Sequence, residues 1–206
     1  MRARTVGAPC EAYPVPEAVI FDLDGVLLDS EQLWNRAEEQ LARCSGGRWH
    51  EDAPTVMLGM SSPEWARYLP DELAVPLDPQ EINRQVVRRM QELYREQLPP
   101  LPGALDVVRA LRQRWPLGLA SSSSNREIIE LFLKLGELAG MFAATVSSEE
   151  VARGKPAPDV NLAAAEKMGV DPVKTAAVED SSNGRRAATA AGMTVIAMQS
   201  ALSAHR

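Results

Sequence analysis

The stretch Ala18-Val-Ile-Phe-Asp-Leu-Asp-Gly-Val-Leu-Leu-Asp-Ser-Glu31 decides the fold, because it joins a short apolar run to a polar turn. The run Ala18 to Phe21 is too short for a helix and predicts a strand that is buried on both faces. Asp22 and Asp24 come at its end, and Gly25 then lets the chain turn. Asp is also common in turns that have no further role, so the rest of the chain must decide whether these acids are functional.

Length and composition limit the class of protein. The 206 residues, 45% of them hydrophobic, are enough for one sizeable core and a smaller accessory domain. The formal charge of -6 leaves no basic surface, so we expect neither nucleic acid nor a membrane as partner. Cys10 and Cys44 have no metal-binding spacing and are too few for a disulfide scaffold, which fits a reducing cytoplasm. We therefore expect a cytoplasmic protein, and a monomer by default.

We expect three segments along the chain. Residues 1–16 contain no apolar core of signal-peptide length and are interpreted as a flexible extension. Residues 31–98 have little strand character and repeat apolar residues at helical intervals, which predicts a small helical cap. The proline-rich segment 98–103 cannot continue a helix and predicts a linker back to the core. The core is then built from residues 17–30 and 99–206.

From residue 104 onward, helical and short apolar segments alternate, which predicts an α/β protein with a parallel sheet and right-handed crossovers. The expected helices cover residues 104–113, 126–135, 159–168 and 185–190, and the expected strands cover 117–120, 143–146, 175–178 and 194–198. In such sheets ligands lie beyond the carboxyl ends of the strands, so functional side chains should follow the apolar runs. The polar residues found there are Asp22, Asp24, Ser121 to Asn125, Lys155, Glu179 and Asp180.

Glu179 and Asp180 bring the number of acids expected at this sheet edge to four. Their mutual repulsion is costly unless some are protonated or a cation lies among them. A site with oxygen ligands and without His or Cys favours Mg²⁺ over zinc. The alternative for Glu179 and Asp180 is an acidic loop that only caps the following helix.

Two further segments supply groups that can bind an anion. Ser121 and Ser122 lie where a strand gives way to a helix, and serines there cap the helix or bind a phosphate. Asn125 is a further candidate at the same turn. Lys155 lies between a glycine and a proline in Arg-Gly-Lys-Pro-Ala-Pro-Asp. A loop lysine is usually a solvated charge, but among four carboxylates it is the cation that a phosphate requires.

Four motifs follow one another at suitable separation: FDLDGV from Phe21, LASSS from Leu119, GKPAPD from Gly154 and VEDSSNG from Val178. Together they resemble the four motifs of the haloacid dehalogenase superfamily, whose members mostly hydrolyse phosphate esters. The resemblance implies a Rossmann-like three-layer core with an inserted α-helical cap, similar to the beta-phosphoglucomutase-like subgroup. Relatives usually carry a further strand and helix near the C-terminus, whereas this sequence ends at Arg206, a departure that concerns the sheet edge and not the site.

The resemblance implies a Mg²⁺-dependent phosphatase that acts on a small phosphorylated metabolite, a sugar or polyol phosphate. Asp22 is then the nucleophile that forms an aspartyl-phosphate, and Asp24 is the general acid and base. The implied metal ligands are Asp22, the backbone carbonyl of Asp24, Asp180, and Glu179 either directly or through water. The implied phosphate-binding residues are Ser121 and Lys155, with Ser122 and Asn125 as further candidates.

Two alternatives share these motifs: a phosphosugar mutase and a catalytically silent binding protein. In the mutases of this family a cap histidine controls proton transfer from the catalytic acid, and a cap arginine holds the second phosphate of a bisphosphate. The matching positions here are Trp34 and the neighbourhood of Ser62, which has no cation. Both differences favour the phosphatase, although Trp34 could also simply pack at the hinge.

Overall fold

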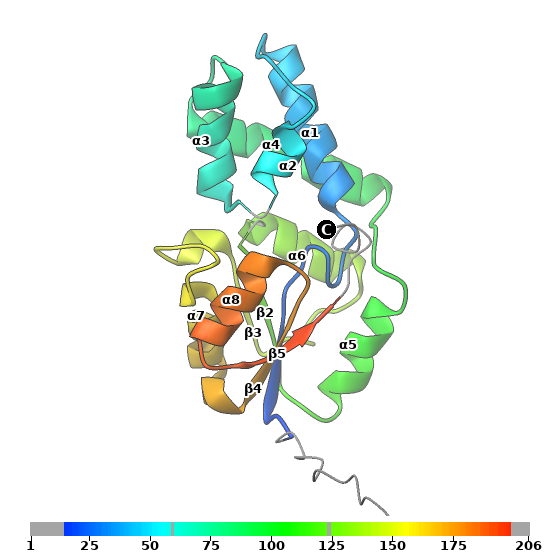
Figure 1. Cartoon of the computed structure of the whole chain (residues 1–206). Coiled ribbons are helices and arrows are strands. Elements are labelled where there is room, and N and C mark those ends of the chain that lie inside the picture. Colours follow the sequence, from blue (N-terminus) through cyan, green and yellow to red (C-terminus); the bar gives the residue numbers. More distant parts are fainter. Residues whose placement is uncertain (1–14, 59, 123–124, 199–206) are drawn as a thin grey trace, which may run out of the picture.

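A computed structural model of the chain describes residues 15–58, 60–122 and 125–198. Residues 1–14, most of the predicted N-terminal extension, lie outside the described residues. The described part contains a sheet of parallel strands in the order β3-β2-β1-β4-β5, with helices on both faces (Figure 1). The predicted fold class, a Rossmann-like α/β core with an inserted helical cap, is confirmed.

The strands are β1 (Ala18–Phe21), β2 (Leu117–Ala120), β3 (Ala144–Val146), β4 (Thr175–Glu179) and β5 (Thr194–Ala197). The central strand β1 pairs with β2 on one side and β4 on the other, and it is buried on both faces as its apolar run predicts. The strand order reverses at β1, because the chain continues to β2 and β3 and then returns to β4. The carboxyl ends of β1 and β4 therefore flank the switch point at which such sheets bind ligands.

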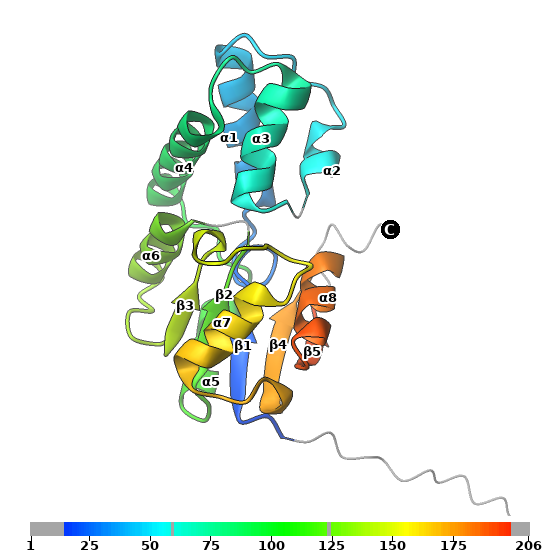
Figure 2. The same cartoon turned by 90° about the vertical axis from the view of Figure 1, so that its left-hand side faces the viewer.

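Alternate residues of β1 face two halves of the core. The helices around the sheet are α5 (Ala104–Arg112), α6 (Arg126–Leu135), α7 (Asp159–Met168) and α8 (Ser182–Ala190), with the short 3-10 helices η1 (Ser148–Glu150) and η2 (Pro172–Lys174). Val19 and Phe21 pack with α5, α6 and the cap helices, whereas Ile20 packs with α7 and α8. Figure 2 shows α7 lying across that second face of the sheet. The alternating side chains of β1 thus pack against the helical layers on both faces of the sheet.

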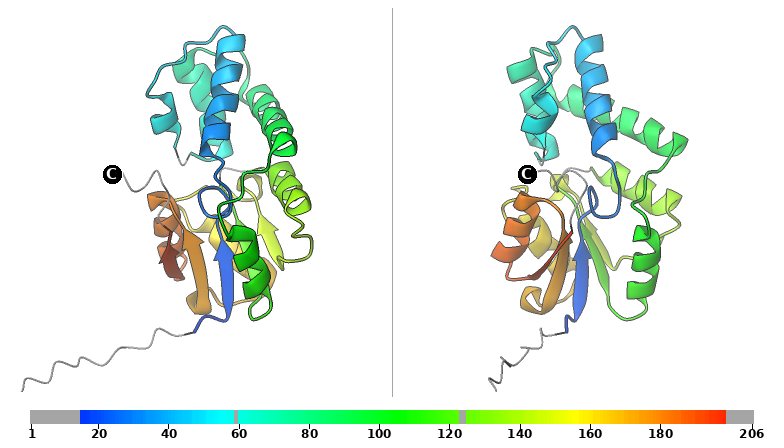
Figure 3. Two further views of the ribbon diagram at one scale, coloured as in Figure 1. Left: turned by 90° about the vertical axis from the view of Figure 1, so that its right-hand side faces the viewer. Right: turned by 45° about the vertical axis from the view of Figure 1, so that its right-hand side comes forward.

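The helices α1 (Glu31–Cys44), α2 (Ala53–Met57), α3 (Ser62–Leu73) and α4 (Pro79–Glu96) lie together beyond the carboxyl ends of the strands (Figures 1 and 3). Within this cap, α4 packs against α1 and α3, and it also contacts α6 of the core. None of the helices in the described ranges is long and apolar enough to cross a membrane. The boundaries of the cap at residues 31 and 98 remain a prediction.

Two linkers that run side by side join the cap to the core. The backbone N–H of Asp29 donates to the carbonyl of Pro99 at 2.9 Å, and the N–H of Leu101 donates to the carbonyl of Leu27 at 3.0 Å. The first linker begins directly after the acids that follow β1. The turn that carries Asp24 is therefore continuous with the paired linkers to the cap.

The start of α8 differs from the prediction. The helix begins at Ser182, three residues before the expected Arg185, because the Ser181 hydroxyl accepts a hydrogen bond from the N–H of Gly184 at 2.9 Å. The sequence Ser-Ser-Asn-Gly is typical of turns, so the pattern misses the first turn of this helix. Beyond it, β5 forms the edge of the described sheet, and its side chains are largely exposed.

Candidate active site

Three acids meet at the switch point of the sheet. Asp22 follows β1 and its N–H donates to the carbonyl of Val178 in β4 at 3.1 Å, so the two strand ends are held together. Glu179 is the last residue of β4, and Asp180 follows it. One carboxylate oxygen from each of these three acids lies within 4.8 Å of the others. The parallel register of β1 and β4 thus brings together three of the four acids that the strand-end pattern places at this edge.

Lys155 reaches this cluster from the loop that precedes α7. Its Nζ lies 2.9 Å from Oδ1 of Asp22 and 2.6 Å from Oε1 of Glu179, and it donates to the carbonyl of Ala120 at 3.1 Å. The side chain is only 4% exposed, so the ion pairs are not screened by bulk water. Lys155 is therefore a fixed charge at the switch point and not the solvated lysine that a surface loop usually carries.

Burial and mutual repulsion set the protonation of the acids. Burial, reinforced by Asp22 and Asp180 and opposed by Lys155, raises the pKa of Glu179 to about 8. Burial and the charge of Asp22 raise the pKa of Asp180 to about 6, and burial also raises the pKa of Asp22. Burial by itself lowers the pKa of Lys155, but the carboxylates of Asp22 and Glu179 outweigh it and raise that pKa. One lysine does not balance the two buried acids and the half-buried Asp180, so the site favours a second cation.

Two glycines give the acids room. A Cβ at Gly25 would lie 2.1 Å from Oδ2 of Asp180, and Gly25 has a φ of +77°, which side chains rarely adopt. A Cβ at Gly184, in the first turn of α8, would lie 1.8 Å from Oε2 of Glu179. The glycine of the first motif and the glycine of the fourth are thus both required by the close approach of a carboxylate.

The donor set fits a hard divalent cation. Asp22, Glu179 and Asp180 offer carboxylate oxygens only, a set that suits Mg²⁺, Ca²⁺ or Mn²⁺ better than zinc. Oε2 of Glu179 is buried and has no hydrogen-bond partner in the described part of the chain. Such an oxygen is costly unless it is protonated or bound to a cation. The predicted metal site is therefore chemically sound for the acids that are brought together.

The serines after β2 lie beside this cluster and are buried. The backbone N–H of Ser121 donates to the carbonyl of Val146 at 3.0 Å, so this N–H serves the sheet and only the hydroxyl remains a candidate phosphate ligand. The Ser122 hydroxyl accepts a hydrogen bond from the backbone N–H of Lys155 at 3.1 Å. Ser122 thus holds the loop that positions Lys155, a role that its place in the sequence did not indicate.

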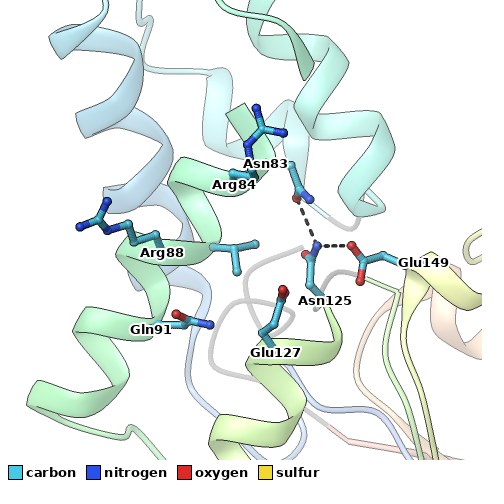
Figure 4. Close-up of a pocket in the computed structure, with 8 residues that line it drawn as sticks. Asn83, Arg84, Arg88, Gln91, Asn125, Glu127 and Glu149 are labelled. Carbon is cyan, nitrogen blue, oxygen red and sulfur yellow. Dashed lines mark hydrogen bonds between the residues drawn. The ribbon is translucent and has the colours of Figure 1, made fainter. Parts of the chain in front are cut away.

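Asn125 lies at the contact between cap and core, where its side chain points toward Asn83 and Glu149 (Figure 4). Its Oδ1 accepts from the hydroxyl of Ser62 at the start of α3 at 3.0 Å, and its Nδ2 donates to Glu149 at 2.7 Å and to Asn83 of α4 at 3.4 Å. A pocket of about 260 Å³ opens beside it between α4 and α6. The side chain of Asn125 therefore bonds to cap and core groups, and its predicted role in phosphate binding stays a prediction.

Asp24, the fourth acid of the prediction, is not among the three acids whose oxygens lie within 4.8 Å of one another. Its Oδ1 accepts hydrogen bonds from Oγ of Ser30 and from Nε1 of Trp34, the latter at 3.1 Å. Trp34 belongs to the cap helix α1, so a residue of the cap touches a predicted catalytic acid. The sequence matched Trp34 to the cap histidine of the mutases but did not predict that Trp34 and Ser30 bond to Asp24, because a buried indole at helical spacing is indistinguishable from a core residue.

The described residues form an α/β fold with three carboxylates and a buried lysine at the switch point of its parallel sheet. The chain belongs to the family of haloacid dehalogenase-like hydrolases, whose family model matches residues 16–192. The resemblance inferred from the four motifs is confirmed.

Characterised relatives and solved structures agree with this family. The chain is 36% identical to hexitol phosphatase B of Escherichia coli (strain K12), over 87% of this chain and 82% of the relative. It is 32% identical to a phosphorylated carbohydrates phosphatase of Thermotoga maritima, over 86% of this chain and 82% of the relative. CbbY from Rhodobacter sphaeroides, solved in complex with phosphate, matches it with a TM-score of 0.81 at 28% identity, covering 93% of this chain and 89% of that one.

Proposed function

We propose that the protein is a Mg²⁺-dependent phosphatase that hydrolyses a sugar or polyol phosphate through an aspartyl-phosphate. The observation that carries the proposal is the position of Lys155, which lies 2.9 Å from Asp22 and 2.6 Å from Glu179 at the switch point. A buried ammonium beside a strand-end carboxylate stabilises the charge of a phosphoryl group that is transferred to that carboxylate. The two relatives that are phosphatases of hexitols and phosphorylated carbohydrates support this substrate class.

In the first step, a carboxylate oxygen of Asp22 attacks phosphorus, and the bond from phosphorus to the ester oxygen breaks. Asp24 donates a proton to that oxygen, so an alcohol leaves and the phosphoryl group stays on Asp22. Lys155 and the hydroxyl of Ser121 hold the phosphoryl oxygens. These groups require little movement during the transfer, because both are buried and fixed by the surrounding sheet.

In the second step, water attacks the phosphorus of the aspartyl-phosphate. Asp24, now a carboxylate, accepts a proton from this water, and the bond from phosphorus to the oxygen of Asp22 breaks. Inorganic phosphate leaves and Asp22 is regenerated as a carboxylate. Asp24 ends the cycle protonated, ready for the next leaving group.

Asp22, Asp180 and the backbone carbonyl of Asp24 would hold Mg²⁺, with Glu179 as a direct or water-mediated ligand. When bound, the cation neutralises part of the phosphoryl charge and orients the phosphate oxygens. Mg²⁺ is favoured among hard cations because it keeps water ligands that a phosphate oxygen can replace. Glu179, which bonds to Lys155, would then lie between the ammonium and the metal ion.

We expect activity to require Mg²⁺ and the melting temperature to rise when Mg²⁺ is added, because the acids are assembled only in the folded protein. At a hundredfold excess over Kd, binding stabilises the protein by about 2.7 kcal/mol. Thermal unfolding with and without Mg²⁺ measures this. Asp180→Asn should remove most of the increase, whereas Asp106→Asn, at an exposed acid on α5, should keep it. Equal melting temperature and activity in Mg²⁺ and in chelator would contradict the assignment.

The cap contact argues for a phosphatase and against a mutase. A mutase must retain a bisphosphate for a second transfer, which requires a cationic anchor in the cap. Near the matching position, Ser62 instead donates to Asn125 at 3.0 Å, and both side chains are buried. Without a cation at this position, we expect water to reach the aspartyl-phosphate before a second substrate hydroxyl does.

The function is tested by incubating the protein and Mg²⁺ with hexitol and hexose phosphates, including a hexose 1-phosphate with a trace of its bisphosphate. We expect inorganic phosphate from at least one of these esters and no net isomerisation. Conversion to the 6-phosphate without phosphate release would identify a mutase. Absence of turnover on every ester, p-nitrophenyl phosphate included, would identify a silent binding protein.

We further propose that the protein works in the cytoplasm as a monomer. The formal charge of -6 supports the absence of nucleic acid and of an anionic membrane among its partners. The sparse cysteines support a reducing compartment. Its partner is then the small phosphorylated metabolite alone.

A further inference from the structure

The cap contains a buried carboxyl group that the proposed mechanism does not use. Glu38 lies on α1, is only 4% exposed, and forms no hydrogen bond or ion pair in the described part of the chain. Burial raises its pKa to about 8, and neither a hydrogen bond nor a neighbouring charge opposes this shift. The next residue, Glu39, is partly exposed and pairs with Arg43 at 2.8 Å. A buried carboxyl group without a partner is costly, so Glu38 destabilises the cap unless something binds to it.

A second polar group without a partner lies nearby, on α3. Trp65 is buried, and its indole N–H has no hydrogen-bond acceptor among the described residues. Its ring packs against that of Trp34, with the ring centroids 6.0 Å apart. Glu38 follows Trp34 by four residues on α1, so the two side chains adjoin each other on one face of that helix. Glu38 and Trp65 are thus both neighbours of Trp34, on two different helices of the cap.

This part of the cap lies where a leaving group must arrive. The Trp34 indole N–H donates to Oδ1 of Asp24 at 3.1 Å. Asp24 is the proposed acid, so the ester oxygen must lie beside it during phosphoryl transfer. The carbon chain that this oxygen carries then begins next to Trp34, and its further carbons come within reach of the side chains that surround Trp34.

The two groups differ in what they need from a ligand. An ammonium group would satisfy the carboxyl group of Glu38, but it offers no acceptor to the N–H of Trp65. A carboxylate or a second phosphate would accept from Trp65 but would be repelled by Glu38 in its ionised form. A hydroxyl group both donates and accepts, so neighbouring hydroxyl groups can satisfy both residues. The pair therefore favours a leaving group that is uncharged and hydroxylated.

We propose that Glu38 and Trp65 form a hydroxyl-binding subsite that selects esters whose leaving group carries hydroxyl groups beyond the ester carbon. Glu38 accepts a hydrogen bond from one hydroxyl group, and Trp65 donates to another. The inference rests on the proposed phosphatase function and adds the side chains that recognise the alcohol. These side chains distinguish one alcohol from another and take no part in phosphoryl transfer itself.

The test compares kcat/KM on a hexitol phosphate and on hexyl phosphate, which has the same chain length and no hydroxyl groups. The wild type should prefer the hexitol ester by at least about tenfold, because a site built for hydroxyl groups is left unpaired by the hexyl chain. Glu38→Leu replaces the carboxyl group by an apolar group of similar size. It should lower this preference by at least about tenfold, roughly the effect of one lost hydrogen bond to a carboxylate. Aminohexyl phosphate is the probe for an ammonium group.

Two further variants accompany Glu38→Leu. Trp65→Phe removes the N–H and keeps an aromatic ring against Trp34, so it should lower the preference for the hexitol ester in the same direction. It also carries the test if Glu38→Leu does not fold. Glu39→Leu is the matched control, because it makes the same substitution at the adjacent, partly exposed position, and it should keep the preference of the wild type.

The outcomes separate this inference from the proposed function. Equal losses on the hexitol and hexyl esters in both variants, or no loss, would overturn the subsite, as would a wild type that hydrolyses both esters equally well. If Glu38→Leu lost most on aminohexyl phosphate, Glu38 would bind an ammonium group and the hydroxyl assignment would be wrong. If the wild type with Mg²⁺ hydrolysed none of these esters and no p-nitrophenyl phosphate, the proposed function itself would fail.

Discussion

Asp22→Asn is expected to abolish turnover while the protein stays folded. The substitution keeps the size of the side chain but removes the nucleophilic carboxylate, so kcat should fall by about 10⁴-fold or more. The fold should tolerate it because Lys155 retains Glu179 as partner at 2.6 Å and one buried charge is removed from a cluster of acids. Burial raises the pKa of Asp22, which means that its ionised form does not stabilise the folded state by itself. Phosphate release and thermal unfolding measure the two effects.

The matched control for this variant is Asp29→Asn, the same substitution seven residues later on the exposed side of the linker. It should retain activity close to that of the wild type. Retention of more than a tenth of the wild-type activity by Asp22→Asn would rule out the aspartyl-phosphate. A large fall in melting temperature with full loss of activity would assign Asp22 a structural role as well.

The strands and their ends were accessible from the sequence for a physical reason. A strand that is buried on both faces requires an uninterrupted apolar run. The apolar runs of this chain are too short to form buried helices, so they predict strands. The expected β2 coincides with the observed strand, and β4 extends one residue further, to Glu179. Because parallel strands end at one edge, the meeting of Asp22, Glu179 and Asp180 followed from their positions after these runs.

The contacts between cap and core could not be predicted in this way. The bond from Trp34 to Asp24 and the bonds from Asn125 to Ser62 and Asn83 join residues of the cap to residues of the core. Their geometry depends on how α1, α3 and α4 are placed over the sheet, and an amphipathic pattern gives only the face that each helix buries. The sequence pattern therefore did not predict that Asn125 bonds to the cap, and its role in phosphate binding stays a prediction.

Lys155→Met is expected to destabilise the protein as well as inactivate it. Methionine fills a similar volume but leaves the carboxylates of Asp22 and Glu179 buried without their cation, and it leaves the carbonyl of Ala120 without its donor. Removing one partner of a buried ion pair costs about 3–5 kcal/mol. Lys174→Met, which breaks an exposed pair with Glu17, should cost less than about 1 kcal/mol.

The loss of unfolding free energy in Lys155→Met, relative to the wild type, should increase as the pH rises. Burial already raises the pKa of Glu179 to about 8 in the presence of Lys155, and removal of the ammonium raises it further. The folded variant then binds a proton that the unfolded chain releases near its ordinary pKa of 4.5, so its stability falls as pH rises above that value. The wild type keeps the same proton until the pH approaches the pKa of about 8, so chemical unfolding in chelator should show a deficit that grows as the pH rises from 7 to 9. A deficit equal to that of Lys174→Met, or one that grows toward acid, would mean that Lys155 does not compensate the buried acids.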